Sequence, residues 1–125
     1  MPDPIANMIS HVNNCVAINR GFVYIPYSKY KLNVLNAIKQ SGYIDRLSIL
    51  RYNAHKADIA IEFRRVGSAL LIRSVTQISK PGNRVYWTSK RLAREFGTFI
   101  MSTCKGVVNS AFERAHGGEI VCKLL

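Results

Sequence analysis

Residues 58–63 read DIAIEF, in which Ile59, Ile61 and Phe63 alternate with polar or small residues. An alternation of this kind predicts a β-strand that buries one face against a core. The segment FVYI at residues 22–25 predicts a short strand that ends at Pro26, because proline cannot donate to a strand ladder. Residues 43–52 predict a further strand. The strand at 58–63 therefore has partners, and its buried face needs a covering layer.

Two helices can supply that layer. Asp3 and Pro4 predict a helix start, with an acidic cap and a proline in the first turn, and Gly21 is the expected stop. Ser28 can cap a second helix, which Gly42 ends. Apolar residues recur at helical spacing in both segments: Ile5, Met8, Ile9 and Val12 in the first, and Leu32, Leu35 and Ile38 in the second. The first half therefore has the predicted order α-β-α-β-β.

Beyond Phe63 the pattern changes near Gly67, so we expect two small domains, residues 1–66 and 67–125, in an α+β fold. The second domain is expected to be mainly antiparallel β with a short helix. Pro81-Gly82 predicts a type II turn, because glycine accepts the positive φ which that turn requires. The other expected elements are a strand with a bulge at 69–79, strands at 84–87 and 98–103, a helix at 89–96 closed by Gly97, a turn at 104–106, one helical turn at 110–115 and a last strand at 119–125.

The chain of 125 residues has 18 Lys and Arg against 7 Asp and Glu, a net charge of +11. Such a charge repels itself in a folded protein, and a polyanionic partner is its usual explanation. The charge is also clustered, since no acidic residue lies between Pro4 and Ile44 or between Phe63 and Arg94. These blocks leave a positive field for an outside partner. The alternative is a solvated basic surface that serves solubility.

The cysteines and histidines do not predict a metal site. Cys15, Cys104 and Cys122 form no C-x-x-C pair, and the three histidines lack the spacing of metal ligands. Buried free thiols are expected at Cys15 and Cys122, which have apolar neighbours. We expect no metal, cofactor or small-molecule substrate. No signal peptide is evident in the N-terminal MPDP, and the apolar runs are too short to span a bilayer.

The segment GTFIMSTCKG at residues 97–106 carries the clearest binding signal. A strand there ends in Ser102 and Thr103 and is followed by a turn with Lys105 and Gly106. Hydroxyl groups at a strand end can meet the ribose 2′-OH and base edges, and a lysine can meet phosphate. An ordinary hairpin turn with solvated hydroxyls explains the same residues equally well.

Two further segments combine basic and polar groups. SKPGNRVYW contains Lys80, Arg84 and Tyr86 around a turn, where an aromatic ring can stack on a base beside a cation; Trp87 is expected mainly to pack. Ser28, Lys29 and Lys31 open a helix, whose free N–H groups can hold a phosphate. The alternatives are core residues on a strand in the first case and an ordinary capped helix in the second.

Other functions explain the sequence less well. Ser102 to Lys105 spells S-x-x-K, a motif of penicillin-recognising enzymes, but its S-D-N and K-T-G partners are absent. Cys104 beside Lys105 has no evident histidine partner, so we expect no enzyme activity. A DNA-binding or membrane-surface module is a further alternative, although the helix with Lys29, Lys31 and Lys39 is a weak membrane candidate.

Several segments together resemble one family, the small-subunit ribosomal protein S-eight family of bacterial type. The similar segments run in order from Asp3 to Cys122: DPIANMI, SKYKLNVLNAIKQSGYI, ISKPGNRVY, GTFIMSTCKGVV and GGEIVC. The resemblance implies a structural role in the small ribosomal subunit, binding to the central domain of its RNA, and neighbouring ribosomal proteins as partners. It implies no homo-oligomer. A generic RNA- or DNA-binding module, or a messenger-RNA regulator outside the ribosome, is the alternative function.

The resemblance also implies which residues contact RNA. These are Ser102, Thr103, Cys104, Lys105 and Gly106 in one loop, Gly117, Gly118 and Glu119 near the C-terminus, Arg84 and Tyr86 after the turn, and Ser28, Lys29 and Lys31 in the first half. Lys80, before the turn, is a candidate from its place beside these residues. The sequence departs from the family pattern in three places. Cys104 stands where the family commonly has a hydroxyl residue. His11 and Asn13 stand where basic residues are usual, and the segment between Gly106 and Gly117 is shorter than is usual in the family. This divergence favours a mitochondrially encoded subunit, with a bacterial or plastid ribosome as alternatives.

Overall fold

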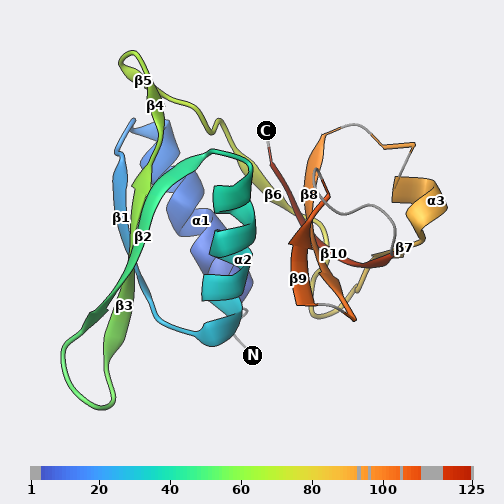
Figure 1. Ribbon diagram of the computed structural model, residues 1–125, viewed down its shortest axis with the longest axis horizontal. Helices are drawn as coiled ribbons and strands as arrows, with labels where there is room; N and C mark the ends of the chain where they lie inside the picture. The colour runs from blue at the N-terminus through green and yellow to red at the C-terminus, as the bar shows by residue number, and fades with distance from the viewer. Residues whose placement is uncertain (1–3, 93, 96, 105, 111–116, 125) are drawn as a thin grey trace.

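A computed structural model describes residues 4–92, 94–95, 97–104, 106–110 and 117–124 of the chain. It has an N-terminal half of two helices on a sheet and a C-terminal half built mainly of strands, which lie beside each other (Figure 1). The α+β fold class expected from the sequence is confirmed.

The N-terminal half consists of α1 (Pro4–Ala17), β1 (Phe22–Pro26), α2 (Lys29–Gln40), β2 (Ile44–Arg51) and β3 (Ala57–Phe63). The strands form an antiparallel sheet in the order β1-β3-β2. Both helices lie on the same face of this sheet (Figure 1). The predicted alternation is confirmed, because Ile59, Ile61 and Phe63 are buried.

The ends of the two helices follow local chemistry. The Ser28 hydroxyl accepts a hydrogen bond from the backbone N–H of Lys31 at 3.1 Å, which confirms the predicted cap of α2. Gly42 follows that helix with φ of 86°, as expected for its end. The predicted stop of α1 at Gly21 is wrong. The helix ends at Ala17, and Asn19 takes the left-handed conformation with φ of 58°, which asparagine tolerates.

The C-terminal half begins with a small ribbon, β4 (Arg65–Val66) and β5 (Ala69–Leu70). A second antiparallel sheet has the order β6-β10-β8-β9, and β7 also pairs with β10. Its strands and helix are β6 (Val75–Gln77), β7 (Tyr86–Trp87), α3 (Ser89–Leu92), β8 (Thr98–Thr103), β9 (Gly106–Asn109) and β10 (Gly118–Leu124).

Several local predictions for this half are wrong. The single strand expected at 69–79 is two strands, because β5 pairs with β4 and β6 pairs with β10, so the chain bends between them. The turn at Lys80–Asn83 exists, but Gly82 has no positive φ, so it is not a type II turn. The helix α3 ends at Leu92, where the bond from Arg94 N–H to Arg91 O begins a tighter turn. Strand β9 was not predicted. The helical turn expected at 110–115 lies mostly outside the described residues.

The two halves share one hydrophobic core. Its largest cluster contains Met8 and Leu35 from the helices and Ile59 from the first sheet, together with Ile100 and Cys122 from the second. A smaller cluster on the other face of the second sheet joins Leu92, Phe99, Met101 and Ile120. The second sheet is therefore covered on both faces. The division into domains 1–66 and 67–125 stays a prediction.

Asn13 and Asn109 connect the second sheet to the two helices through polar bonds. The Asn13 side chain donates to the Val75 carbonyl at 2.8 Å and accepts from the Val75 N–H at 2.9 Å, so α1 is joined to β6. The buried Asn109 amide on β9 donates to the Ala37 carbonyl at 2.8 Å and to the Ser41 hydroxyl, at the end of α2. These bonds hold the second sheet at a set position against both helices.

Among the residues that the structure describes, none of the helices is long and apolar enough to cross a membrane. Within the same residues, no group of three or more His, Cys, Asp or Glu side chains is arranged to hold a metal ion.

Candidate nucleic-acid interface

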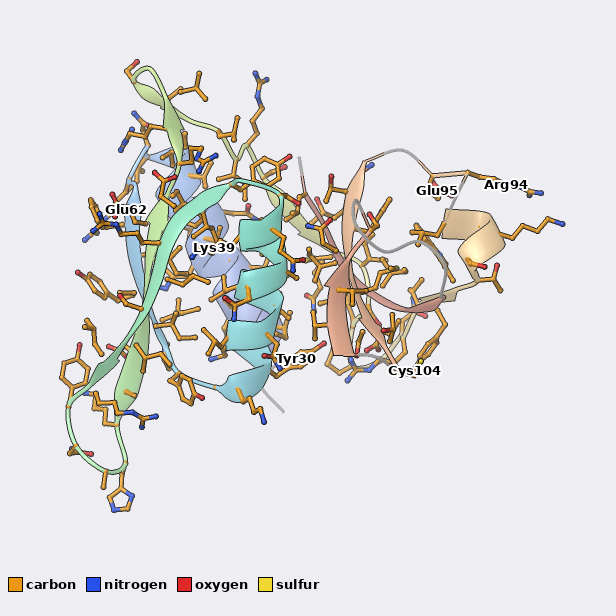
Figure 2. The ribbon with its side chains drawn as sticks, viewed as in Figure 1. Tyr30, Lys39, Glu62, Arg94, Glu95 and Cys104 are labelled. Carbon is orange, nitrogen blue, oxygen red and sulfur yellow. The ribbon has the colours of Figure 1, made fainter. Side chains whose placement is uncertain are left out.

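A surface hollow of about 470 Å³ lies between the two halves. Figure 2 shows Tyr30, at the start of α2, on the side of that helix that faces the second sheet. The residues around the hollow come from α1, from the start of α2, from the segment that leads into β7, and from β7, β8 and β10. They are Ile5, Ser28, Tyr30, Lys31, Arg84, Tyr86, Ser102 and Glu119. Six of the residues predicted from sequence to bind RNA therefore meet around one space.

The α2 side of the hollow presents a cation in a set position. Lys31 is half-buried, and its Nζ donates to the Pro26 carbonyl at 3.3 Å. The Ser28 hydroxyl already accepts the N–H of Lys31, so its main role is to cap the helix. Lys29 is exposed and does not line the hollow. Of the three predicted residues here, Lys31 is placed best to meet a phosphate.

The opposite side carries a pair of charges supported by a buried serine. Glu119 Oε2 accepts from the Ser79 hydroxyl at 2.9 Å and lies 3.4 Å from Arg84 Nη1. The Glu119 side chain is 16% exposed and the Arg84 side chain 53%, so the carboxylate is enclosed while the guanidinium reaches solvent. Ser79 itself accepts the Val85 N–H at 3.1 Å. This arrangement orients the Arg84 guanidinium and leaves some of its N–H groups available to donate to a ligand.

Tyr86 gives this wall an aromatic surface. It is 69% exposed, whereas its neighbour Trp87 is half-buried and packs edge-on against Phe99 with ring centroids 5.1 Å apart. The Arg91 guanidinium lies 4.6 Å from the centroid of the Trp87 ring. Packing of Trp87 and exposure of Tyr86 both agree with the expectation from sequence. The exposed ring can stack on a base.

The β8–β9 hairpin is the third part of the site. Ser102 is half-buried and lines the hollow, in register with Val107 on one side and Glu119 on the other. The Thr103 hydroxyl donates to the Gly106 carbonyl at 3.1 Å, across the turn. Cys104 is exposed at the end of the hairpin, as Figure 2 shows, and it is not among the residues that line the hollow. Lys105, also predicted to contact RNA, lies outside the described residues.

Gly117 and Gly118 are required by close packing of backbones. A Cβ added to Gly117 would meet the Trp87 carbonyl oxygen, and one added to Gly118 would meet the Ser102 carbonyl oxygen. Strands β7, β8 and β10 therefore approach one another without room for a side chain. These glycines place Ser102, Tyr86 and Glu119 around the hollow. Lys80 is exposed on the preceding turn and does not line it.

Two residues of the hollow are not among the RNA contacts predicted from the sequence. Tyr30 is 39% exposed and Ile5 is buried, and both line the hollow. From sequence, Ile5 fits the apolar face of the first helix and Tyr30 lies in the first turn of the second. The signal available for Tyr30 was its place between the two predicted lysines, Lys29 and Lys31, because an aromatic residue among cations is typical of nucleic-acid sites.

The arrangement is suited to binding. It offers two cations for phosphate, exposed aromatic rings for stacking, and a hydroxyl and a carboxylate for base edges or ribose. None of the described residues that line the hollow is a histidine, the usual base for a serine nucleophile. None of them is a cysteine, which could itself act as a nucleophile. Its groups match a nucleic acid with exposed bases better than a small substrate.

The chain resembles known proteins over nearly its whole length. The family model for ribosomal protein S8 matches residues 3–125. Small ribosomal subunit protein uS8 of Sinorhizobium medicae (strain WSM419) is 35% identical over 129 residues, which cover 99% of this chain and 98% of that protein. The protein of the same name from Allorhizobium ampelinum is 36% identical with the same coverage. The likeness therefore includes every segment that lines the hollow.

Proposed function

The chain belongs to the ribosomal protein S8 family, and from this premise we propose that it binds small-subunit ribosomal RNA through the hollow between its halves. As a member of that family it is a structural constituent of the small ribosomal subunit and not an enzyme. The observation that carries the proposal is the convergence of Lys31, Arg84, Tyr86 and Ser102 on one space from distant parts of the chain.

The RNA we propose is a helical element of the central domain with exposed or unpaired bases. Ser102 would meet a base edge or ribose, and Tyr86 would stack on a base. Lys31 and Arg84 would meet phosphates, and Glu119 would hold Arg84 in place. The hairpin residues Thr103 to Gly106 and the exposed cations Lys29 and Lys80 would extend this contact beyond the hollow. Neighbouring small-subunit proteins complete the proposed surroundings.

The test is a filter-binding titration of the protein against central-domain RNA fragments at two salt concentrations, with duplex DNA as competitor. Ser102→Ala with Thr103→Val should weaken binding by about 30-fold, because two hydrogen bonds contribute about 1 kcal/mol each. The matched control is Ser48→Ala with Thr76→Val, which removes the same groups from exposed positions on β2 and β6. Equal affinities of the two double variants would remove the hairpin from the site.

A generic basic module that binds RNA or DNA outside the ribosome is the second candidate, favoured by the net charge of +11 alone. It predicts equal, salt-sensitive binding to RNA and duplex DNA in the same titration. Control of the protein's own messenger RNA would be an additional role of the same hollow.

The relatives named above are bacterial. A mitochondrial ribosome stays a prediction from sequence divergence. Detection of the protein in ribosomes purified from fractionated mitochondria would test it.

A further inference from the structure

The first sheet has an open face on the side away from its helices. In Figure 1, α1 and α2 cover one face of β1, β3 and β2, and no other described helix or strand covers the opposite face. Side chains alternate between the two faces, and the buried Val23, Ile59 and Ile61 point to the helices. The residues between them and their partners in register form the open face: Phe22, Tyr24 and Pro26 on β1, Asp58, Ala60 and Glu62 on β3, and Arg46, Ser48 and Leu50 on β2.

The open face is unusually apolar for a surface in contact with solvent. A sheet with one solvated face normally places polar residues on that face. Here the exposed fraction is 56% for Phe22, 50% for Tyr24 and 39% for Leu50. A hollow of about 250 Å³ lies between these side chains, and the small Ala60 on the central strand β3 also lines it. An apolar surface with such a hollow is typical of an interaction site.

The charge of the open face is opposite in sign to that of the whole chain. One cation, Arg46, and two carboxylates, Asp58 and Glu62, give a net charge of −1, whereas the chain carries +11. The Arg46 guanidinium is 3.9 Å from the Glu62 carboxylate, and Asp58 accepts the Tyr52 hydroxyl at 3.2 Å. Both carboxylates lie on the central strand, on either side of Ala60. The open face is therefore acidic at its centre.

This charge decides between the possible occupants. Aromatic rings on a sheet can stack on RNA bases, but such sites combine the rings with cations for the phosphates. Carboxylates in the middle of the face would repel phosphate instead. A second copy of this chain would also be repelled, because each copy carries +11. The charge and the apolar groups together fit a basic protein segment.

We propose that the open face docks a neighbouring protein of the small subunit, through a segment that carries an aliphatic side chain between Lys or Arg residues. The aliphatic side chain would enter the hollow over Ala60, and the basic residues would meet Asp58 and Glu62. Apolar burial would supply most of the affinity, and the carboxylates would select a basic segment. The inference rests on the proposed function, because it assigns a surface to the neighbouring proteins named there.

The two binding surfaces then lie on different sides of the molecule. The hollow proposed for RNA lies between α2 and the second sheet, whereas the open face lies across the first sheet from α2 (Figure 1). Figure 2 shows Glu62 on the outer side of this sheet and Tyr30 on the inner side of the molecule. The protein can therefore hold RNA and a protein neighbour at the same time, and a change in one surface should leave the other intact.

The experiment compares two variants for their incorporation into small ribosomal subunits. Phe22→Thr with Leu50→Thr makes the open face polar and keeps residues that strands accept. The control, Ile18→Thr with Val66→Thr, makes the same kind of change at residues that are 71% and 62% exposed and lie outside the open face. Each tagged variant is expressed beside the wild-type protein, and mass spectrometry of purified small subunits gives the ratio of variant to wild type.

We expect this ratio to fall about tenfold for the open-face variant, the effect of losing one anchor of an interface, and to stay near that of the wild type for the control. Urea unfolding and affinity for the naked central-domain RNA fragment should both be unchanged within about twofold, because the substituted residues are exposed. Equal incorporation of the open-face variant and the control would overturn the inference.

Photocrosslinking identifies the occupant directly and does not depend on a destabilising substitution. With benzoylphenylalanine in place of Tyr24, irradiated small subunits should give an adduct that survives ribonuclease and contains a basic peptide of another small-subunit protein. An adduct with RNA, an adduct with a second copy of this chain, or the absence of an adduct would each overturn the inference. The same group in place of Tyr86 should crosslink to RNA, and its failure to do so would instead count against the proposed function.

Discussion

The bond pair between Asn13 and Val75 makes a specific prediction about how the halves are held together. The two residues are 62 positions apart in the chain, and Val75 lies on β6, at the edge of the second sheet. The Asn13 amide satisfies both the N–H and the carbonyl of Val75, at 2.9 Å and 2.8 Å. Asn13→Ala leaves both backbone groups without this partner in a partly buried position.

The expected cost follows from those two bonds. A net contribution of about 1 kcal/mol for each bond gives about 2 kcal/mol, less the few tenths by which alanine favours the helix. The matched control is Asn14→Ala, which makes the same substitution at the exposed neighbouring position of α1. It should be neutral or slightly stabilising. Urea unfolding at neutral pH measures both, and with a slope of about 2 kcal/mol per molar the Asn13 variant should unfold about 1 M earlier.

The same measurement can refute this reasoning. If Asn13→Ala and Asn14→Ala unfold at the same urea concentration, the amide does not hold α1 against β6. The shared hydrophobic cluster and the Asn109 bonds would then hold the second sheet against the helices.

Three further predictions follow from the glycines and cysteines. Gly118→Ala should destabilise the protein by about 3 kcal/mol, since the new Cβ meets the Ser102 carbonyl, and an unchanged denaturation midpoint would contradict this close approach. Burial raises the pKa of the Cys122 thiol from 9.0 to about 12, so the folded state holds this proton more tightly and the free energy of unfolding should fall as pH rises from about 9 to about 12. The fall is up to about 1.4 kcal/mol per pH unit. Cys122→Val lacks this thiol, so the free energy of unfolding of the wild type relative to that of the variant should fall by the same slope over this pH range. Iodoacetamide should alkylate exposed Cys104 in the native protein, and Cys15 and Cys122 only after unfolding. Bound RNA should slow the reaction at Cys104, and an equal rate with and without RNA would place the hairpin tip outside the interface.

Local features of the fold could be predicted because they depend on neighbours in the chain. The alternation at Ile59, Ile61 and Phe63 and the cap at Ser28 are set within a few residues, and the structure has both. The errors arose where partners are distant. The segment 69–79 is divided because its two ends pair with different strands, which its own residues do not indicate.

The candidate site was predicted in part for the same reason. Hydroxyls, cations and aromatic residues can be recognised by type, so the sequence indicates Lys31, Arg84, Tyr86 and Ser102 as candidates. Their convergence on one hollow needs the packing of α2 against the second sheet, and so does the inclusion of Tyr30.

The sequence by itself therefore determined the order of helices and strands in the first half, the basic charge and the kinds of group available for RNA. These properties are carried by periodicity, caps and composition, which act locally. Only the tertiary structure decided which groups act together. Gly117 and Gly118 let three strands approach, and Asn13 and Asn109 hold the sheet against the helices. A binding surface is made by such through-space contacts, and no local pattern in the chain encodes them.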